Sequence, residues 1–112
     1  MNKSVLVTGA AGGTGFAIAE RFAKEGYDVF IGSREKQRAQ EAAAKLREKY
    51  SVSAVGYAMK TNDEENVRSI FGDLRARGSL LDVLVLNAAN LGLRQNALTV
   101  DIKDFLDVIA TN

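Results

Sequence analysis

Short apolar runs alternate along the chain with longer segments in which apolar residues recur every three or four positions. The short runs, at residues 5–7, 29–31, 53–59 and 81–86, have the length and composition of buried strands. The helical stripes between them are Phe16, Ala19, Phe22 and Ala23, then Ala39, Ala42, Ala43 and Leu46, then Val67, Ile70, Phe71 and Leu74. The pattern predicts strands separated by helices.

Residues that start and stop helices stand at the ends of these stripes. Gly26 and Gly78 are placed to end the first and third helices in left-handed caps. Ser33 is placed to cap a second helix that runs to residue 49, and Thr61 with Glu64 has capping-box spacing ahead of the third. The helix boundaries are therefore expected near these residues.

Strands that alternate with helices predict a doubly wound α/β fold. We expect a three-layer, Rossmann-type parallel sheet in the strand order 3-2-1-4, with one domain over residues 1–112. A last helical pattern follows a loop to about residue 98 and is still running at Asn112, so we expect a truncated domain. The fourth strand, at 83–86, would then be an unpaired apolar edge, and we expect a homo-oligomer formed through it or through the last helix.

Composition narrows the function classes. The 112 residues are 46% hydrophobic with a net charge of +1, and charges of both signs are mixed, which indicates neither nucleic acid nor a membrane surface as partner. Cysteine and histidine are absent, so no disulfide and no metal site is expected. Since no signal pattern or membrane-length apolar run is present, a cytoplasmic protein is expected.

A glycine-rich segment, Thr8-Gly9-Ala10-Ala11-Gly12-Gly13-Thr14-Gly15, joins the first strand to the first helix. Gly9 would allow a tight turn, Gly13 would let the backbone approach a pyrophosphate, and Gly15 would let the helix pack closely. Amides at the helix N-terminus would face the anion. The alternative is a purely structural glycine turn, and the absence of a following Gly-Lys-Ser/Thr excludes a P-loop.

At these residues the chain resembles the short-chain dehydrogenase/reductase family, whose cofactor motif has the form Thr-Gly-x-x-x-Gly-x-Gly. A second family motif, Asn-Asn-Ala-Gly, is similar to Leu86-Asn87-Ala88-Ala89. The resemblance implies an oxidoreductase with a nicotinamide cofactor, in which Asn87 steadies the sheet and lines the cofactor site. The alternative for Asn87 is a side chain that bonds its own loop. The cofactor residues expected are Thr8, Gly9, Gly12, Gly13, Thr14, Gly15, Ser33, Arg34, Asp63, Asn87, Ala88 and Ala89.

The end of the second strand favours NADP as the cofactor, with NAD as second choice. In such folds an acidic residue there binds the ribose 2′-hydroxyl, whereas Arg34 offers a planar donor fork suited to a 2′-phosphate, with Lys36 and Arg38 nearby. Arg34 could instead simply begin a solvated helix. Some NADP-dependent relatives carry a second cation in the glycine loop, which reads Ala11-Gly12 here. The acidic residue that relatives use near the adenine falls at Lys60, and Asp63 follows as a helix cap.

Most of the family's catalytic apparatus is not found. Relatives use a tyrosine as acid or base and a lysine four residues later that lowers its pKa. The residues four after Tyr27, Tyr50 and Tyr57 are Ile31, Ala54 and Thr61, and Tyr57 with Lys60 is not expected to form a hidden pair. Only Asn112 corresponds to a catalytic position.

Three functions are compatible with these features to different degrees. The first is the nucleotide-binding portion of an NADP-dependent oxidoreductase that reduces a small-molecule carbonyl or oxidises an alcohol, inactive by itself. The second is a non-enzymatic dinucleotide-binding or interaction module. The third is a methyltransferase, which commonly has an acidic residue after the second strand, and Ser33-Arg34 argues against it.

Overall fold

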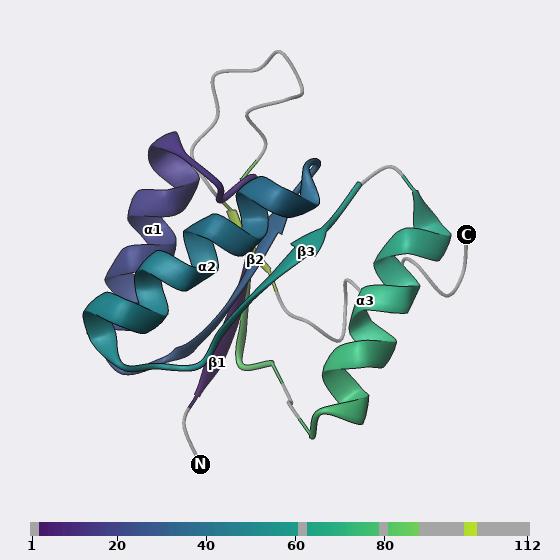
Figure 1. The fold of residues 1–112 in the computed structure, drawn as a ribbon. Coiled ribbons are helices and arrows are strands. Elements are labelled where there is room, and N and C mark those ends of the chain that lie inside the picture. Colours follow the sequence, from purple (N-terminus) through teal and green to yellow (C-terminus); the bar gives the residue numbers. More distant parts are fainter. Residues whose placement is uncertain (1–2, 61–62, 79–80, 88–97, 101–112) are drawn as a thin grey trace.

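Four parallel strands form the centre of the molecule. The structure, a computed structural model, describes residues 3–60, 63–78, 81–87 and 98–100 (Figure 1). Strands β1 (Ser4–Thr8), β2 (Asp28–Ser33), β3 (Ala54–Ala58) and β4 (Val83–Leu86) lie in the order β3-β2-β1-β4. Every neighbouring pair among them is parallel. The predicted α/β fold and its strand order 3-2-1-4 are confirmed.

A fifth strand, β5 (Leu98–Val100), lies on the far side of β4. It runs antiparallel, with Leu84 opposite Val100 and Leu86 opposite Leu98. The predicted unpaired edge at residues 83–86 is therefore wrong. The prediction considered only parallel neighbours, which need a long crossover, whereas an antiparallel neighbour needs none.

Helices cover both faces of the sheet (Figure 1). On one face lie α1 (Gly13–Lys24) and α2 (Lys36–Tyr50), and on the other lies α3 (Glu64–Ala76). The buried positions of α2 and α3 are those of the predicted stripes, except that Phe71 is only half-buried. In α1, Ala19 and Ala23 are buried while Phe16 and Phe22 pack at the margin of the core. The result is the three-layer arrangement that the sequence predicts.

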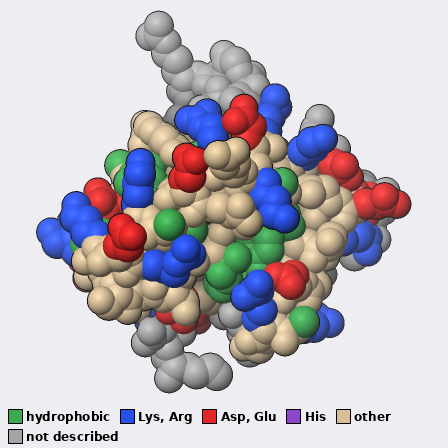
Figure 2. All heavy atoms as spheres, in the orientation of Figure 1, with side chains coloured by type: hydrophobic (Ala, Val, Ile, Leu, Met, Phe, Trp, Pro, Cys, Tyr) green, Lys and Arg blue, Asp and Glu red, His purple; other side chains and the backbone are tan. Residues whose placement is uncertain are grey.

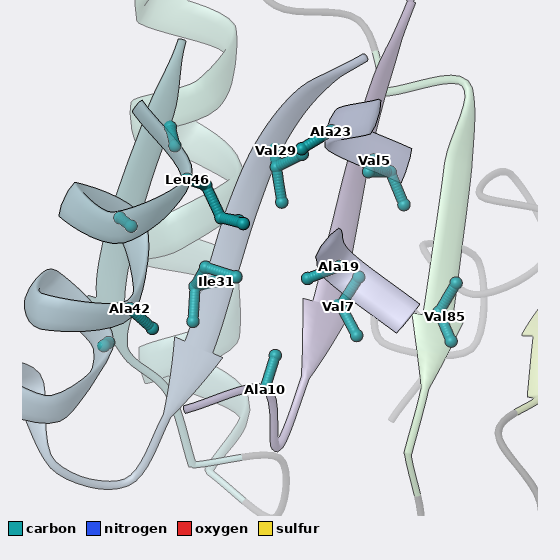
Figure 3. Packing of buried hydrophobic residues seen from close by; sticks show 13 residues of the cluster. Val5, Val7, Ala10, Ala19, Ala23, Val29, Ile31, Ala42, Leu46 and Val85 are labelled. Carbon is teal, nitrogen blue, oxygen red and sulfur yellow. The ribbon is translucent and has the colours of Figure 1, made fainter. Parts of the chain in front are cut away.

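Two hydrophobic clusters separate these layers. Figure 3 shows the larger one, between the sheet and the helix pair, with small side chains from the helices facing β-branched ones from the strands. Its members are Val5, Val7, Ala10, Ala19, Ala23, Val29, Ile31, Ala39, Ala42, Ala43, Leu46, Ala54 and Val85. The cluster on the α3 face consists of Leu6, Phe30, Met59, Val67, Ile70, Leu74 and Leu84. Successive residues of β1 and β2 thus alternate between two cores, as in a sheet covered on both sides.

The glycines that close α1 and α3 behave as predicted. Gly26 and Gly78 both have positive φ, 90° and 77°, the left-handed conformation that glycine adopts without steric cost.

The N-terminal caps differ from prediction. Ser33 is the last residue of β2, and α2 begins only at Lys36 with Glu35 at the N-cap position, so the prediction that Ser33 caps α2 is wrong. Ser33 is held in the sheet because it pairs with Ala58 and its carbonyl accepts from the Met59 amide at 2.7 Å. Its hydroxyl accepts from the Glu35 amide at 3.4 Å, which extends the turn before the helix.

Asp63 is the N-cap of α3, since its carboxylate accepts a hydrogen bond from the Asn66 amide at 3.1 Å. The predicted cap at Thr61 is therefore wrong, and Thr61 itself lies outside the described residues. Asp63 lies closer to the first apolar turn and supplies the acceptor.

Charges of both signs are interspersed on the face drawn in Figure 2. Within the described part of the chain, no helix is long and apolar enough to cross a membrane.

Candidate functional site

The loop between β1 and α1 turns through two glycines in the left-handed region. Gly9 has φ +62° and Gly13 has φ +60°, so a side chain at either position would strain the backbone. Gly12, between them, is the N-cap of α1 and has extended backbone that any residue can adopt. The tight turn predicted at Gly9 is confirmed.

Gly15 sets how closely α1 approaches the loop. A Cβ on Gly15 would overlap the Gly9 carbonyl oxygen and lie 2.8 Å from Nδ2 of Asn87. The predicted close packing is confirmed. The atoms that leave no room for a Cβ on Gly15 belong to the glycine loop and to Asn87 after β4. Gly15 is accordingly buried, while Gly12, Gly13 and Thr14 are exposed.

The N-terminus of α1 offers amides to an acceptor outside the helix. The first intrahelical bond runs from the Phe16 amide to the Gly12 carbonyl at 3.3 Å, so the preceding amides of this turn have no partner within the helix. No side chain caps the helix, and its first turn contains no acidic residue. Among the described residues, nothing lies within 4 Å of where a Cβ on Gly13 would be. This open, positively polarised end fits a phosphate group.

Asn87 clamps the loop to the end of β4. Its backbone amide donates to Oγ1 of Thr8 at 2.9 Å, and its side-chain Nδ2 donates to the Gly9 carbonyl at 3.3 Å. The alternative that Asn87 serves only its own loop is therefore wrong. Thr8 is buried beneath the loop, so the structure assigns its hydroxyl to positioning the turn. A direct contact of Thr8 with a cofactor stays a prediction.

The end of β2 is joined to the same loop. The Ala10 amide donates to the Gly32 carbonyl at 3.1 Å, which brings the Ser33-Arg34 turn beside the glycine loop. Arg34 is exposed. Gly32 lies under Met59, because a Cβ there would be 2.9 Å from the Met59 sulfur. The carboxyl ends of β1, β2 and β4 thus meet at the edge where ligands bind in open α/β sheets.

A second arginine lies closer to the loop than the sequence indicates. The Nη2 of Arg38, in the first turn of α2, is 3.5 Å from where a Cβ on Gly12 would lie. The sequence places Arg38 only in the neighbourhood of Arg34, since the packing of α2 against α1 decides which way the side chain reaches. The only feature of the sequence that indicates this position for Arg38 is its spacing of four residues from Arg34.

The turn after β3 is held by Asn66, which the sequence analysis did not single out. The Asn66 side chain accepts from the Lys60 amide at 2.7 Å and donates to the Ala58 carbonyl at 2.9 Å. With the Asp63 cap, these bonds fix the chain between β3 and α3. Asp63 thus has a structural task, and its predicted role toward a cofactor stays a prediction.

Tyr57 is bonded to a carboxylate on α3. Its hydroxyl donates to the carboxylate of Asp73 on α3, and Arg77 donates to the same carboxylate oxygen at 2.8 Å. Burial, followed by the hydrogen bond to Asp73, raises the pKa of Tyr57 to about 12. A phenol with a raised pKa is a poor base at neutral pH, in agreement with the expectation that Tyr57 and Lys60 form no catalytic pair.

Three predicted site residues, Ala88, Ala89 and Asn112, lie outside the described residues. Among the residues that are described, no group of three or more carboxylate, histidine or cysteine side chains is arranged to hold a metal ion.

Comparison with known proteins finds reductases among the similar sequences. A family model described as short chain dehydrogenase matches residues 3–112. Sulfoacetaldehyde reductase 2 of Chromohalobacter salexigens is 33% identical over 112 residues, covering 100% of this chain and 44% of the relative. A 3-oxoacyl-(acyl-carrier-protein) reductase of Staphylococcus aureus is 36% identical over 119 residues, covering 100% of this chain and 45% of the relative. The chain thus spans less than half the length of these relatives.

Solved structures give a similar result. L-sorbose reductase from Gluconobacter frateurii, complexed with NADPH and L-sorbose, superposes with a TM-score of 0.75 at 34% identity, covering 92% of this chain and 37% of that one. An alcohol dehydrogenase from Thermococcus sibiricus, complexed with 5-hydroxy-NADP, gives a TM-score of 0.70 at 27% identity, covering 75% of this chain and 36% of that one.

Proposed function

Because the chain belongs to the short-chain dehydrogenase family, we propose that the loop at residues 8–15 binds the pyrophosphate of NADP(H). The observation that carries this proposal is the uncapped N-terminus of α1, approached through Gly9 and Gly13 in conformations that keep side chains away. Amides of Gly13 and Thr14 would bond the phosphate oxygens. Thr8, Gly15 and Asn87 would hold the loop in shape.

NADP is proposed over NAD because β2 ends in Ser33, where no carboxylate stands, and the next residue is the cation Arg34. Ser33 and Arg34 would receive the 2′-phosphate of the adenosine, for which a planar guanidinium is a bidentate donor. The NADPH and 5-hydroxy-NADP in the related structures support the same choice. NAD, whose ribose lacks the phosphate, remains the second candidate.

The reaction proposed for a protein that contains this chain is hydride transfer between the nicotinamide and a small-molecule carbonyl or alcohol. The reductases and the alcohol dehydrogenase among the relatives support that substrate class. Asn112 is the one proposed catalytic residue within the chain. The nicotinamide supplies the hydride, and this segment would bind and orient the adenosine half. Mixed surface charge supports a small ligand rather than nucleic acid or a membrane as partner.

The 112 residues by themselves are proposed to bind the cofactor without turnover. No tyrosine in the sequence is followed four residues later by a lysine, and Tyr57 is bonded to Asp73. The lack of a tyrosine followed four residues later by a lysine also favours the second candidate function, a non-enzymatic dinucleotide-binding module.

Calorimetric titration of the chain with NADPH, and separately with NADH, tests the binding proposal. We expect saturable binding of both, tighter for NADPH. A parallel assay at 340 nm with a panel of ketones should give no NADPH consumption. Absence of binding would refute the proposed function, and ketone reduction by the chain would refute the claim that it lacks the catalytic groups.

A further inference from the structure

Strand β3 is an edge strand of the sheet, so every second residue in it turns its backbone groups away from β2 (Figure 1). The Val29 amide of β2 donates to the Ser53 carbonyl, which therefore points inward. Because the backbone groups of successive strand residues point to opposite sides, those of Ala54, Gly56 and Ala58 point outward. An outward row of N–H and C=O groups is a template on which another chain can add a strand.

The side chain of Asn66 takes the place of a neighbouring strand at the carboxyl end of β3. Its Nδ2 donates to the Ala58 carbonyl at 2.9 Å, and its Oδ1 accepts from the Lys60 amide at 2.7 Å. A residue in a parallel neighbouring strand makes the same two bonds, one to the carbonyl before its partner and one to the amide after it. The carboxamide of Asn66 therefore ends the outward row as a peptide group would.

Arg47 covers the other end of the outward row. Its Nη1 donates to the Ala54 carbonyl at 2.6 Å. Helix α2 lies so close to β3 that a Cβ on Gly56 would overlap the Ala39 backbone, and this packing brings the last turn of α2 beside the start of the strand. Because the donor is a charged guanidinium, its bond to the carbonyl is stronger than the bond that a competing amide would make.

Two copies of the chain could pair symmetrically at this edge. If the two β3 strands run antiparallel with Gly56 opposite Gly56, then Ala54 of each copy lies opposite Ala58 of the other, and the outward groups exchange hydrogen bonds. The carbonyls of Ala54 and Ala58 are already bonded to Arg47 and Asn66. Only the central pair at Gly56 could therefore form without displacing a side chain.

We infer that Arg47 and Asn66 close the β3 edge against a second copy of this chain, so that β3 stays unpaired in solution. The inference is independent of the proposed cofactor site. It implies that a homo-oligomer of this chain uses a surface other than β3.

Sedimentation velocity over a concentration series tests the inference in two variants, Arg47→Ala and Asn66→Ala, each of which opens one of the two carbonyls. Each variant should lower the dissociation constant of the dimer by at least about tenfold, because the carbonyl opened in each copy accepts a bond from the other. Arg75→Ala, which removes the same charge from an exposed position on α3, is the matched control and should have no effect.

A proline variant shows whether the gained association uses β3. In the symmetric pairing, the Ala58 amide of one copy donates to the Ala54 carbonyl of the other, which is the carbonyl that Arg47→Ala opens. Ala58→Pro removes this amide, and proline is tolerated on edge strands where the missing N–H faces outward. Added to Arg47→Ala, it should return the dissociation constant to that of the unsubstituted chain.

Three results would overturn the inference in variants that far-UV circular dichroism shows to be folded. The first is a dissociation constant in Arg47→Ala and Asn66→Ala equal to that in Arg75→Ala. The second is an association of Arg47→Ala that Ala58→Pro does not reverse. The third is a dimer of the unsubstituted chain that Ala58→Pro alone dissociates, since β3 would then already be paired. If Arg47→Ala does not fold, Asn66→Ala decides the first comparison by itself.

Discussion

Two glycines within helices, Gly15 and Gly72, should respond in opposite ways to the same substitution. A Cβ on Gly15 overlaps the Gly9 carbonyl, whereas a Cβ on Gly72 in α3 meets nothing within 4 Å in the described part of the chain. We expect Gly15→Ala to destabilise the fold by about 1–3 kcal/mol through overpacking, and to weaken NADPH binding because the loop must shift. Gly72→Ala should stabilise by about 0.5–1 kcal/mol. Urea unfolding measures both, and a stable Gly15→Ala would contradict the close approach.

Sequence reasoning located most of the residues of the loop but not all of their contacts. The Thr-Gly-x-x-x-Gly-x-Gly spacing was sufficient for Gly9 and Gly15, because their roles follow from local backbone geometry. The bond from Asn87 to the Gly9 carbonyl joins positions 78 residues apart, and the position of Arg38 depends on how two helices pack. Neither contact is encoded in local spacing.

At the scale of elements, Asp63 tests whether the turn before α3 serves the helix or a cofactor. Asparagine is about as good an N-cap as aspartate, whereas alanine loses the acceptor and costs about 0.5–2 kcal/mol. If Asp63 is a cap only, Asp63→Asn should retain both thermal stability and NADPH affinity, while Asp63→Ala lowers the melting temperature. A selective loss of NADPH affinity in Asp63→Asn would instead assign the carboxylate to the cofactor.

The packing of α3 on β3 should weaken at high pH. Burial and the bond to Asp73 raise the pKa of Tyr57 to about 12, from 10 in an unfolded chain. A raised folded-state pKa means that this contribution to stability is fully present below pH 10 and is lost as the pH rises toward 12. The free energy of unfolding should therefore fall across that window.

The variant Tyr57→Phe should show a smaller fall, since phenylalanine has no proton to lose. It should also cost about 1 kcal/mol at pH 7, because one hydrogen bond is removed. Tyr27→Phe, which keeps the ring contact with Phe22, is the control. An equal decline with pH in Tyr57→Phe and the unsubstituted chain would argue against the bond to Asp73.

Element types were predictable from periodicity, but the ends of elements depended on competition between neighbours. Ser33 has the composition of a cap, yet its pairing with Ala58 extends β2 through it and moves the start of α2 to Lys36. Of the two caps predicted for α3, Asp63 is confirmed and Thr61 is not, because the Asp63 acceptor lies three residues before the Asn66 amide. Side chains suited to a cap are common, and the sheet decides which of them is used.

At the scale of the whole molecule, cofactor binding should stabilise the fold by mass action. A ligand present at 100 times its Kd adds about 2.7 kcal/mol to the free energy of unfolding. Differential scanning fluorimetry should therefore show a higher melting temperature with NADPH, and a smaller increase with NADH at the same concentration. An identical shift for the two would contradict the preference for NADP.

Global topology was predictable up to the fourth strand and no further. The order 3-2-1-4 follows from alternating elements and right-handed crossovers. The segment at Leu98–Val100 carries too few residues for a periodic signal, so its antiparallel pairing with β4 was missed. A homo-oligomer remains a prediction, but the edge proposed to form it is occupied by β5.

The central position of β1 has a consequence for the order of folding. Its two neighbours are β2, which follows after one helix, and β4, whose Val83 pairs with Val5 across most of the chain. Closing that long loop costs chain entropy and slows folding relative to local contacts. Because Asn87 fastens Thr8 and Gly9 only once β4 has joined, a nascent chain would form its first β-α-β unit early and become competent to bind nucleotide late.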